Sequence, residues 1–475
     1  MQFLALDAGF NKELKMAAQT EKRSPSLERG LNVWHAVAIV AGTIIGSGIF
    51  LVPAEMMQAV GSAGLVYLAW IVGGLLSFFG ALTYAELGAV RPYSGGEYVY
   101  VRDAYGPLPG FLYGWTWFLI AKPGSIATVT SGIVRVLGTF SAFSFLPHAF
   151  FSWHVTSGRL LVVNYGHLVA IAATVVITAL NYIGVRKAGN FQFAFTVLKV
   201  VMIVGIALVA LAASSGSWSN FSTTFTGAKG GIAGFMAALV AALWAYDGWN
   251  DLNMVSEEIQ RPEKTIPIAL IAGVGLVAVL YMGLNAGVQR ALPAETIAHS
   301  AVPAAAASAA VLGRWGVTLV SVGMIVSMLA TLNGTIMSGG RIPFAVARDG
   351  YLFKALAEVH PKFHTPGLAL VLQGVVAIVL IVVGGAFREL FSLTIFAEWL
   401  FYVIAASTIF VFRRREPNAA RPYRTLGYPV LPALFIATAA VLLCYTFFDN
   451  LRNSIAGVAV ILMGIPVYLW FARKR

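Results

Sequence analysis

Charged residues and cysteine are scarce in this chain of 475 residues. Only 11% of its residues are charged and 59% are hydrophobic, whereas a soluble globular protein carries about 25% charged residues. This balance excludes a soluble globular domain and predicts an all-α polytopic membrane protein. The single cysteine, Cys444, excludes a disulfide framework. Because Cys444 lies in an apolar segment, we expect it to be a small core residue.

The sequence also lacks the short motifs of common enzyme classes. None of the seven histidines stands in H-E-x-x-H, no G-x-S-x-G occurs, and no Cys/His cluster could hold zinc. A phosphate-binding glycine loop followed by Lys-Ser or Lys-Thr is missing too. We therefore expect no enzyme, no cofactor, no metal site and no ATP-driven pump. The net charge of +12 is spread over short loops rather than gathered on one face, so no nucleic acid partner is expected.

Twelve apolar runs are each long enough to cross a bilayer, which takes about 20 residues. They are 33-59, 63-88, 107-138, 164-184, 192-213, 232-258, 266-287, 314-339, 367-385, 389-412, 427-447 and 454-472. The tail 1-32 and every second connection after it together contain 23 Lys and Arg residues, whereas the connections on the opposite side contain six. Positive charge is retained on the cytosolic side, so both termini are predicted to lie in the cytosol, with the protein in the cell membrane.

Three glycines interrupt the first apolar run at GTIIGSGIF, residues 42-50. An unwound turn at mid-membrane survives only where protein or a polar ligand covers it. The half-helix after the break offers N–H groups that suit a carboxylate, and carbonyls near Ile44 suit an ammonium group. Gly46, Ser47 and Gly48 therefore predict a site for a zwitterion. The alternative is helix packing, because Gly42-x-x-x-Gly46 is also a packing spacing.

A second break, LWAYDGWNDL at 243-252, interrupts the sixth run about 200 residues later. Interrupted helices at the first position of successive five-helix blocks predict an internal duplication. Since five is odd, the copies at 33-213 and 232-412 would have opposite topology in the membrane. This is an inverted repeat with a substrate site between its halves, and the last two runs, within 427-472, lie outside it.

Polar and aromatic residues of the second break admit two interpretations. Asp247 either contacts a substrate ammonium or a cationic side chain, or it caps the half-helix that follows. Trp244, Tyr246 and Trp249 either wall the pocket or fill the bundle core. Trp244 stands next to the break, which favours a gate.

Three further charged residues lie inside predicted spans. Lys199, in the middle of span five, is predicted to donate to carbonyls of broken span one, where a sodium ion would otherwise sit; the alternative is a lysine within reach of the interface. Glu398 in span ten suits a proton site or a structural partner equally well. Lys122, followed by Pro123, marks an irregular point in span three and receives no role.

Five motifs in order resemble the amino acid–polyamine–organocation (APC) superfamily, and within it the L-type amino acid transporters and their bacterial relatives. They are GTIIGSGIF at 42-50, AEL with a following P-x-S-G-G-E-Y between Ala85 and Tyr98, AYDGWN at 245-250, SEEIQRPEKTIP at 256-267 and RPYRTLGYPVLP at 421-432. The resemblance implies a LeuT-like fold of twelve spans with a five-plus-five inverted repeat, in which helices one and six are unwound at mid-membrane. It also implies sodium-independent amino acid exchange.

Carried over by position, the resemblance assigns backbone N–H groups of Ser47 and Gly48 to the substrate carboxylate. Carbonyls of Ile44, Trp244 and Asp247 take the amino group, and Lys199 replaces a sodium ion. The predicted substrate-binding residues are Ile44, Gly46, Ser47, Gly48, Trp244, Ala245, Tyr246, Asp247, Asn250 and Trp399.

The resemblance also bears on partners. Animal members bond to a single-span glycoprotein through a cysteine in the loop between spans three and four, here about 139-163. That loop has no cysteine, so no disulfide-linked heavy chain is expected, and the expected partners are an amino acid substrate and the lipid bilayer.

The leading hypothesis is a sodium-independent exchanger or uniporter of neutral L-amino acids that works by alternating access. Cationic or mixed substrates are the alternative, motivated by Asp247. A hypothesis of another class is a non-transporting amino acid sensor on the same fold.

Overall fold

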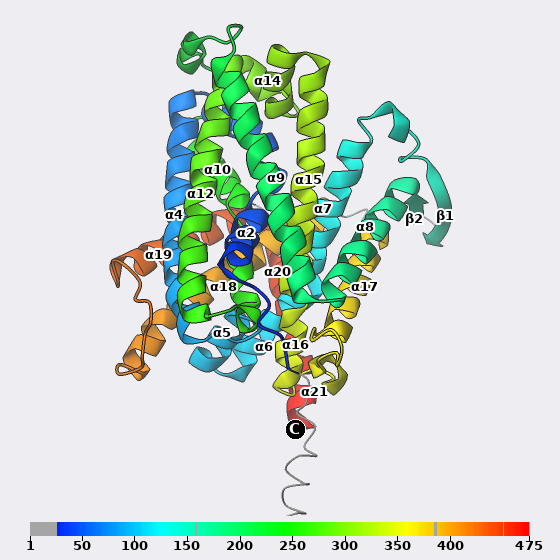
Figure 1. Ribbon diagram of the computed structural model, residues 1–475, viewed down its shortest axis with the longest axis vertical. Coiled ribbons are helices and arrows are strands. Elements are labelled where there is room, and N and C mark those ends of the chain that lie inside the picture. Colours follow the sequence, from blue (N-terminus) through cyan, green and yellow to red (C-terminus); the bar gives the residue numbers. More distant parts are fainter. Residues whose placement is uncertain (1–25, 157–158, 384–386, 450, 475) are drawn as a thin grey trace, which may run out of the picture.

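The computed structural model describes residues 26–156, 159–383, 387–449 and 451–474. Long helices, among them α4, α9, α12 and α15, run side by side along the long axis of the molecule (Figure 1). Most of the predicted tail, residues 1–25, lies outside the described residues.

The described residues form α-helices, short π-helical and 3-10 turns, and two strands. The α-helices are α2 (Val33–Ile44), α3 (Gly48–Val60), α4 (Ala63–Val90), α5 (Glu97–Tyr105), α6 (Pro107–Thr116), α7 (Lys122–Leu137), α8 (Tyr165–Tyr182), α9 (Val185–Ala212), α10 (Gly231–Ala245), α11 (Asp251–Met254), α12 (Pro262–Ala291), α13 (Ala294–His299), α14 (Pro303–Leu312), α15 (Arg314–Gly339), α16 (Arg341–Arg348), α17 (Gly367–Val383), α18 (Phe387–Arg415), α19 (Val430–Asp449), α20 (Leu451–Leu462) and α21 (Gly464–Arg473). A π-helix η1 (Trp117–Ala121) and 3-10 turns η2 (Ser141–Phe143), η3 (Trp218–Ser222), η4 (Ser256–Glu258) and η5 (Lys354–Ala357) join them, with strands β1 (Ala149–Thr156) and β2 (Arg159–Asn164).

Within the described residues, nine helical segments are long and apolar enough to cross a membrane. They coincide with predicted spans one to five, seven, eight, eleven and twelve. Helices α10 and α17 are shorter apolar helices on the sixth and ninth predicted spans, and α18 covers the tenth. The structure is thus that of a polytopic helical membrane protein, and the count of twelve spans stays a prediction.

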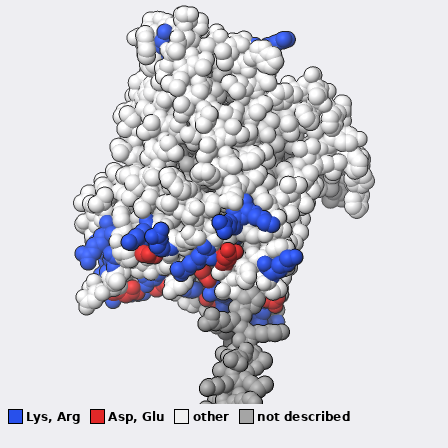
Figure 2. Space-filling model, viewed as in Figure 1, with Lys and Arg blue, Asp and Glu red and all other residues white. Residues whose placement is uncertain are grey.

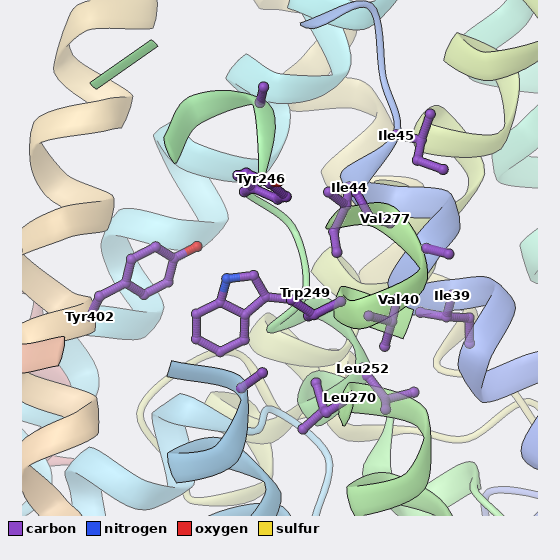
Figure 3. Packing of buried hydrophobic residues seen from close by; sticks show 14 of the residues in the cluster. Ile39, Val40, Ile44, Ile45, Tyr246, Trp249, Leu252, Leu270, Val277 and Tyr402 are labelled. Atoms are coloured by element: carbon purple, nitrogen blue, oxygen red, sulfur yellow. The ribbon is translucent and has the colours of Figure 1, made fainter. Parts of the chain in front are cut away.

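Both interrupted runs are broken helices. Helix α2 ends at Ile44 and α3 begins at Gly48, while α10 ends at Ala245 and α11 begins at Asp251. The second half of one packs against the first half of the other, because α10 contacts α3 and α11 contacts α2. The two broken helices therefore lie antiparallel, and buried side chains around both breaks form a common core (Figure 3).

The irregular point predicted at Lys122 is a π-helical turn, η1, immediately before that residue. Pro123 has no N–H to donate to the carbonyl four residues earlier, so regular α-helical bonding is interrupted there. The extra residue in this turn separates α6 from α7 within one predicted span.

Three features depart from the sequence-based expectations. The outer loop after span three holds an antiparallel hairpin of β1 and β2, so the chain is not wholly α-helical. The segment between spans seven and eight contains α13 and the alanine-rich α14, which is too short to span a bilayer. Cys444 is exposed on α19, not buried in the core. In a membrane protein an apolar helix can face lipid, so hydrophobicity does not imply burial.

Charged side chains gather at the end of the molecule where the C-terminus lies, and the wide band above them carries almost none (Figures 1 and 2). Ion pairs connect the segments at this basic end. They include Arg91 with Glu416, Arg348 with Glu257 and the fully buried Arg341 with Glu258. The pattern matches a protein with an uncharged belt for hydrocarbon and one positively charged surface.

Candidate functional site

A cavity of about 130 Å³ lies between the two helix breaks. This volume is room for a small polar ligand. Its lining comes from both breaks, from α7, α15 and α18, and comprises Thr43, Ile44, Gly46, Ser47, Gly48, Trp117, Lys122, Gly124, Ser125, Thr128, Val129, Trp244, Ala245, Asp247, Gly248, Asn250, Asp251, Thr331, Thr335, Glu398 and Tyr402.

The N-terminal turn of α3 faces this cavity. Helix N-termini have no internal acceptors for their first N–H groups, and among the described residues no backbone bond occupies the N–H of Ser47 or Gly48. A Cβ added at Gly48 would lie 3.3 Å from Cα of Ala245, whereas one at Gly46 would meet nothing closer than 3.7 Å. The backbone at Gly48 therefore faces the cavity and lies close to the second break.

Gly42 has a different role from Gly46 and Gly48. A Cβ at Gly42 would lie 2.1 Å from Nε2 of Gln192 and 2.5 Å from Oγ1 of Thr196, both on α9. This glycine allows α2 and α9 to approach closely, which is the helix-packing use of the residue. Helix packing thus accounts for Gly42, and the ligand interpretation concerns Gly46 and Gly48 alone.

Carbonyls freed at the first break have buried donors. Lys199 Nζ donates to the carbonyl oxygens of Gly42 at 2.6 Å and Ile45 at 2.7 Å. Ser327 Oγ on α15 donates to Ile45 at 2.7 Å, and Thr331 Oγ1 is 3.2 Å from the same oxygen. The side-chain nitrogen of Lys199 thus binds two carbonyl oxygens, the kind of ligand that a hard cation prefers.

The two breaks are also tied to each other. Tyr281 Oη on α12 donates to the carbonyls of Ala245 at 2.8 Å and Ile44 at 3.2 Å. Thr43 Oγ1 donates to the carbonyl of Gly248 at 2.7 Å. At Gly248 φ is +106°, a conformation that favours glycine, and an added Cβ would lie 3.1 Å from the Thr43 backbone. These bonds hold the unwound segments in one fixed relation.

Four charged groups face the cavity. Lys122 on α7 forms a buried ion pair with Asp251 at the start of α11. Asp247 accepts a hydrogen bond of 2.6 Å from Tyr402 Oη on α18. Glu398, one turn before Tyr402, has no hydrogen bond or ion pair to any described residue. One ammonium group and three carboxylates give the cavity an acidic character.

Most of the predicted site residues meet here. The cavity brings together eight of the ten, all except Tyr246 and Trp399. Tyr246 does not line the cavity and packs instead on Trp70 and Tyr281, where its ring lies 5.0 Å from that of Tyr281. Trp399 packs edge-on against Tyr402 at 5.6 Å.

Several lining residues were not found from the sequence. Asp251 carries the only detectable signal, because a second carboxylate in an apolar run needs a partner, and Lys122 is that partner. Thr331 and Tyr402 lie in ordinary apolar helices, and nothing in their spacing marks them. Their contribution depends on how α15 and α18 pack around the breaks.

Comparison with known proteins identifies the family. Residues 31–472 match the family model described as amino acid permease. The chain belongs to the amino acid permease family. The permease is 32% identical over 454 residues to the serine/threonine exchanger SteT of Bacillus subtilis, covering 94% of this chain and 98% of that one. It is 32% identical to the b(0,+)-type amino acid transporter 1 of Mus musculus, with 90% and 86% covered. The large neutral amino acids transporter small subunit 2 of Rattus norvegicus is 30% identical, with 97% and 84% covered.

These relatives are membrane transporters, and the permease is accordingly an amino acid transporter of the APC superfamily rather than an enzyme. The resemblance inferred from the five sequence motifs is confirmed.

Proposed function

We propose that the permease is a sodium-independent exchanger of neutral L-amino acids that works by alternating access. The observation that carries this proposal is the ammonium group of Lys199, which donates to the carbonyls of Gly42 and Ile45 beside the cavity. The side-chain nitrogen of Lys199 occupies this position and leaves no place for a sodium ion, so transport needs no sodium gradient.

The substrate backbone fits the two helix breaks. Its carboxylate binds the N–H groups of Ser47 and Gly48 at the positive end of α3, and its amino group binds carbonyl oxygens of Ile44, Trp244 and Asp247. The open N-terminal turn of α3 supports the first half of this assignment. Trp244 covers the bound substrate as a gate, and Asn250 completes the pocket floor.

The architecture proposed for this mechanism has twelve spans, with 33-213 and 232-412 as inverted repeats and 427-472 outside them. The antiparallel contacts of α10 with α3 and of α11 with α2 support the inversion. The basic end faces the cytosol, together with both termini, because positive charge is retained on that side. Spans one, two, six and seven move against the remaining bundle to open the cavity to either side.

Neutral substrates are favoured because most charged groups of the cavity have partners: Lys122 pairs with Asp251, and Asp247 accepts a hydrogen bond from Tyr402. Two relatives support the same substrate class, since one is a serine/threonine exchanger and the other a large neutral amino acids transporter, and the first also supports exchange.

Cationic or mixed substrates are the second candidate. Glu398 faces the cavity with no ion pair among the described residues, and a carboxylate in this position would bind an ammonium or guanidinium side chain. In that case the side chain of the substrate would point from the breaks toward α18.

A competition experiment separates the candidates. The purified full chain is placed in proteoliposomes, and twenty unlabelled amino acids compete with exchange of radiolabelled L-serine. We expect serine, threonine and other small neutral amino acids to compete. Competition by lysine and arginine as well would indicate mixed specificity, exchange of radiolabelled L-arginine without exchange of L-serine would indicate a cationic transporter, and binding without any exchange would indicate a sensor.

A further inference from the structure

A buried carboxylate lies directly behind the cavity. Glu97, the first residue of α5, is completely buried. It accepts hydrogen bonds from Tyr113 Oη at 2.6 Å, from Tyr84 Oη at 2.9 Å and from Asn250 Nδ2 at 3.1 Å. All three donors are neutral groups, and none is water-exposed.

Other buried carboxylates at the same end of the molecule are paired with guanidinium groups. Glu258 forms a two-pronged ion pair with Arg341, and Glu86 contacts both Arg413 and Arg421. No ion pair joins Glu97 to any part of the chain that the structure describes. A carboxylate buried for stability alone needs a cation beside it, so the surroundings of Glu97 suit a group that gains and loses a proton.

The titratable and charged groups around Glu97 come from every neighbouring element. They are Tyr84 on α4, Tyr100 on α5, Tyr113 on α6, Lys122 on α7, paired with Asp251, and Glu398 and Tyr402 on α18. Burial raises the pKa of Glu97 from 4.5 to about 7, although its three hydrogen bonds and the charge of Lys122 act in the opposite direction. Its proton therefore exchanges near neutral pH.

Hydrogen bonds connect Glu97 with the cavity lining. Asn250 donates its amide N–H to Glu97, and its Oδ1 lies 3.2 Å from Tyr402 Oη. The same hydroxyl donates to Asp247 at 2.6 Å. Asn250, Tyr402 and Asp247 all line the cavity.

Protonation of Glu97 changes the direction of these bonds. An ionised carboxylate only accepts, whereas a protonated one must also donate its O–H. The Asn250 amide accepts this new bond when it turns its Oδ1 toward Glu97, which brings its NH₂ toward Tyr402. Tyr402 then loses an acceptor, and its bond to Asp247 is altered. A proton at Glu97 thus changes the hydrogen bond between Tyr402 and Asp247 in the cavity lining.

We propose that Glu97 is a proton-binding site linked to the substrate cavity through Asn250 and Tyr402, so that proton binding and amino acid binding depend on each other. The proposal rests on the proposed function only in requiring that an amino acid occupies this cavity. Linkage of this kind is reciprocal: if the proton changes substrate affinity, the substrate changes proton affinity by the same factor.

The test measures the dissociation constant of radiolabelled L-serine for the purified full chain between pH 5.5 and 7.5. Free L-serine stays zwitterionic across this window, because its carboxyl group titrates well below pH 5.5 and its amino group well above pH 7.5. We expect the constant to change about fivefold or more, the low end of typical coupling, and to become flat in Glu97→Gln. Glu416→Gln, which removes an exposed carboxylate paired with Arg91, should keep the wild-type profile. A constant wild-type value, or a wild-type profile in Glu97→Gln, would overturn the linkage.

A second measurement needs no substrate. Because the folded pKa of Glu97 lies above 4.5, its contribution to stability is fully present below pH 4.5 and is lost as pH rises through about 7. The unfolding temperature of the wild type should fall over this range, and that of Glu97→Gln should lack this component. Tyr402→Phe should keep the wild-type stability profile but lose the pH dependence of serine affinity. If no amino acid binds, the proposed function fails while the stability profile still reports whether Glu97 binds a proton. Identical stability profiles of wild type and Glu97→Gln would contradict the proton site.

Discussion

At the scale of single residues, the proposal of sodium-independent exchange rests most directly on Lys199. It is buried on α9, and its side-chain nitrogen donates to carbonyl oxygens rather than to a carboxylate. Replacement by a neutral side chain leaves the Gly42 and Ile45 carbonyls without this donor.

Lys199→Ala should therefore lower the exchange rate about tenfold or more, since each hydrogen bond to a charged group contributes about 1.5–3 kcal/mol. Expression should remain largely intact, because Ser327 and Thr331 still donate to the Ile45 carbonyl. Exchange of L-serine in proteoliposomes measures the effect. Lys187→Ala, at an exposed position of the same helix, is the matched control, and an unchanged rate in Lys199→Ala would remove this residue from the mechanism.

Gly48 is sensitive to size rather than to polarity. The first atom of any side chain there would stand 3.3 Å from Ala245 and 3.4 Å from the Trp244 ring. Gly48→Leu should abolish L-serine binding, while Ser47→Ala should change affinity by less than about threefold, because the proposed contact uses the backbone N–H. Gly64→Leu, where an added Cβ meets nothing within 4 Å, should bind normally. Equilibrium binding of L-serine at a fixed pH measures these effects. Normal affinity in Gly48→Leu would show that residues 42-50 serve helix packing rather than ligand binding.

At the scale of elements, the two breaks were predictable and their surroundings were not. Glycines and polar residues in apolar runs mark 42-50 and 243-252, because an apolar helix in lipid has no other reason to contain them. Which aromatic side chain lines the cavity depends on tertiary packing, so Tyr246 faces α4 and α12 although its neighbour Trp244 faces the cavity. The hairpin β1–β2 and the exposure of Cys444 escaped prediction for a related reason: apolar sequence fits lipid, core and strand alike.

The ion pair of Lys122 with Asp251 joins α7 to α11 across the cavity. Asp251→Asn leaves the ammonium group of Lys122 buried without its partner, which costs about 3–5 kcal/mol in comparable cases. We expect a clear fall in the unfolding temperature in detergent. The double variant Lys122→Met with Asp251→Asn should be more stable than Asp251→Asn alone. Equal stability of the two variants would show that the pair contributes no coupling.

At the scale of the whole molecule, the arrangement of charge gives the proposed orientation. The basic end with its ion pairs and the uncharged belt above it follow from loop composition that is already visible in the sequence (Figure 2). The opposite directions of the two broken helices follow from the predicted inverted repeat. The contacts of α10 with α3 and of α11 with α2 needed the structure, because a hydropathy pattern gives the order of the helices but not their neighbours.

Cysteine accessibility tests the orientation. In a Cys444→Ser background, which removes the single native thiol, Lys229→Cys and Arg314→Cys should react with a membrane-impermeant maleimide in intact cells. Lys187→Cys and Lys264→Cys should react only after permeabilisation. All four positions are exposed, so access to the reagent depends on the side of the membrane. The opposite labelling pattern would invert the proposed topology.

Exchange without sodium is the central claim, and counterflow tests it most directly. Proteoliposomes with the purified full chain are loaded with unlabelled L-serine or left empty, and uptake of radiolabelled L-serine is followed in sodium-free and sodium-containing buffer. The proposed exchanger takes up label only into loaded vesicles, at the same rate in both buffers. Uptake that requires sodium, or that is equally fast into empty vesicles, would contradict it.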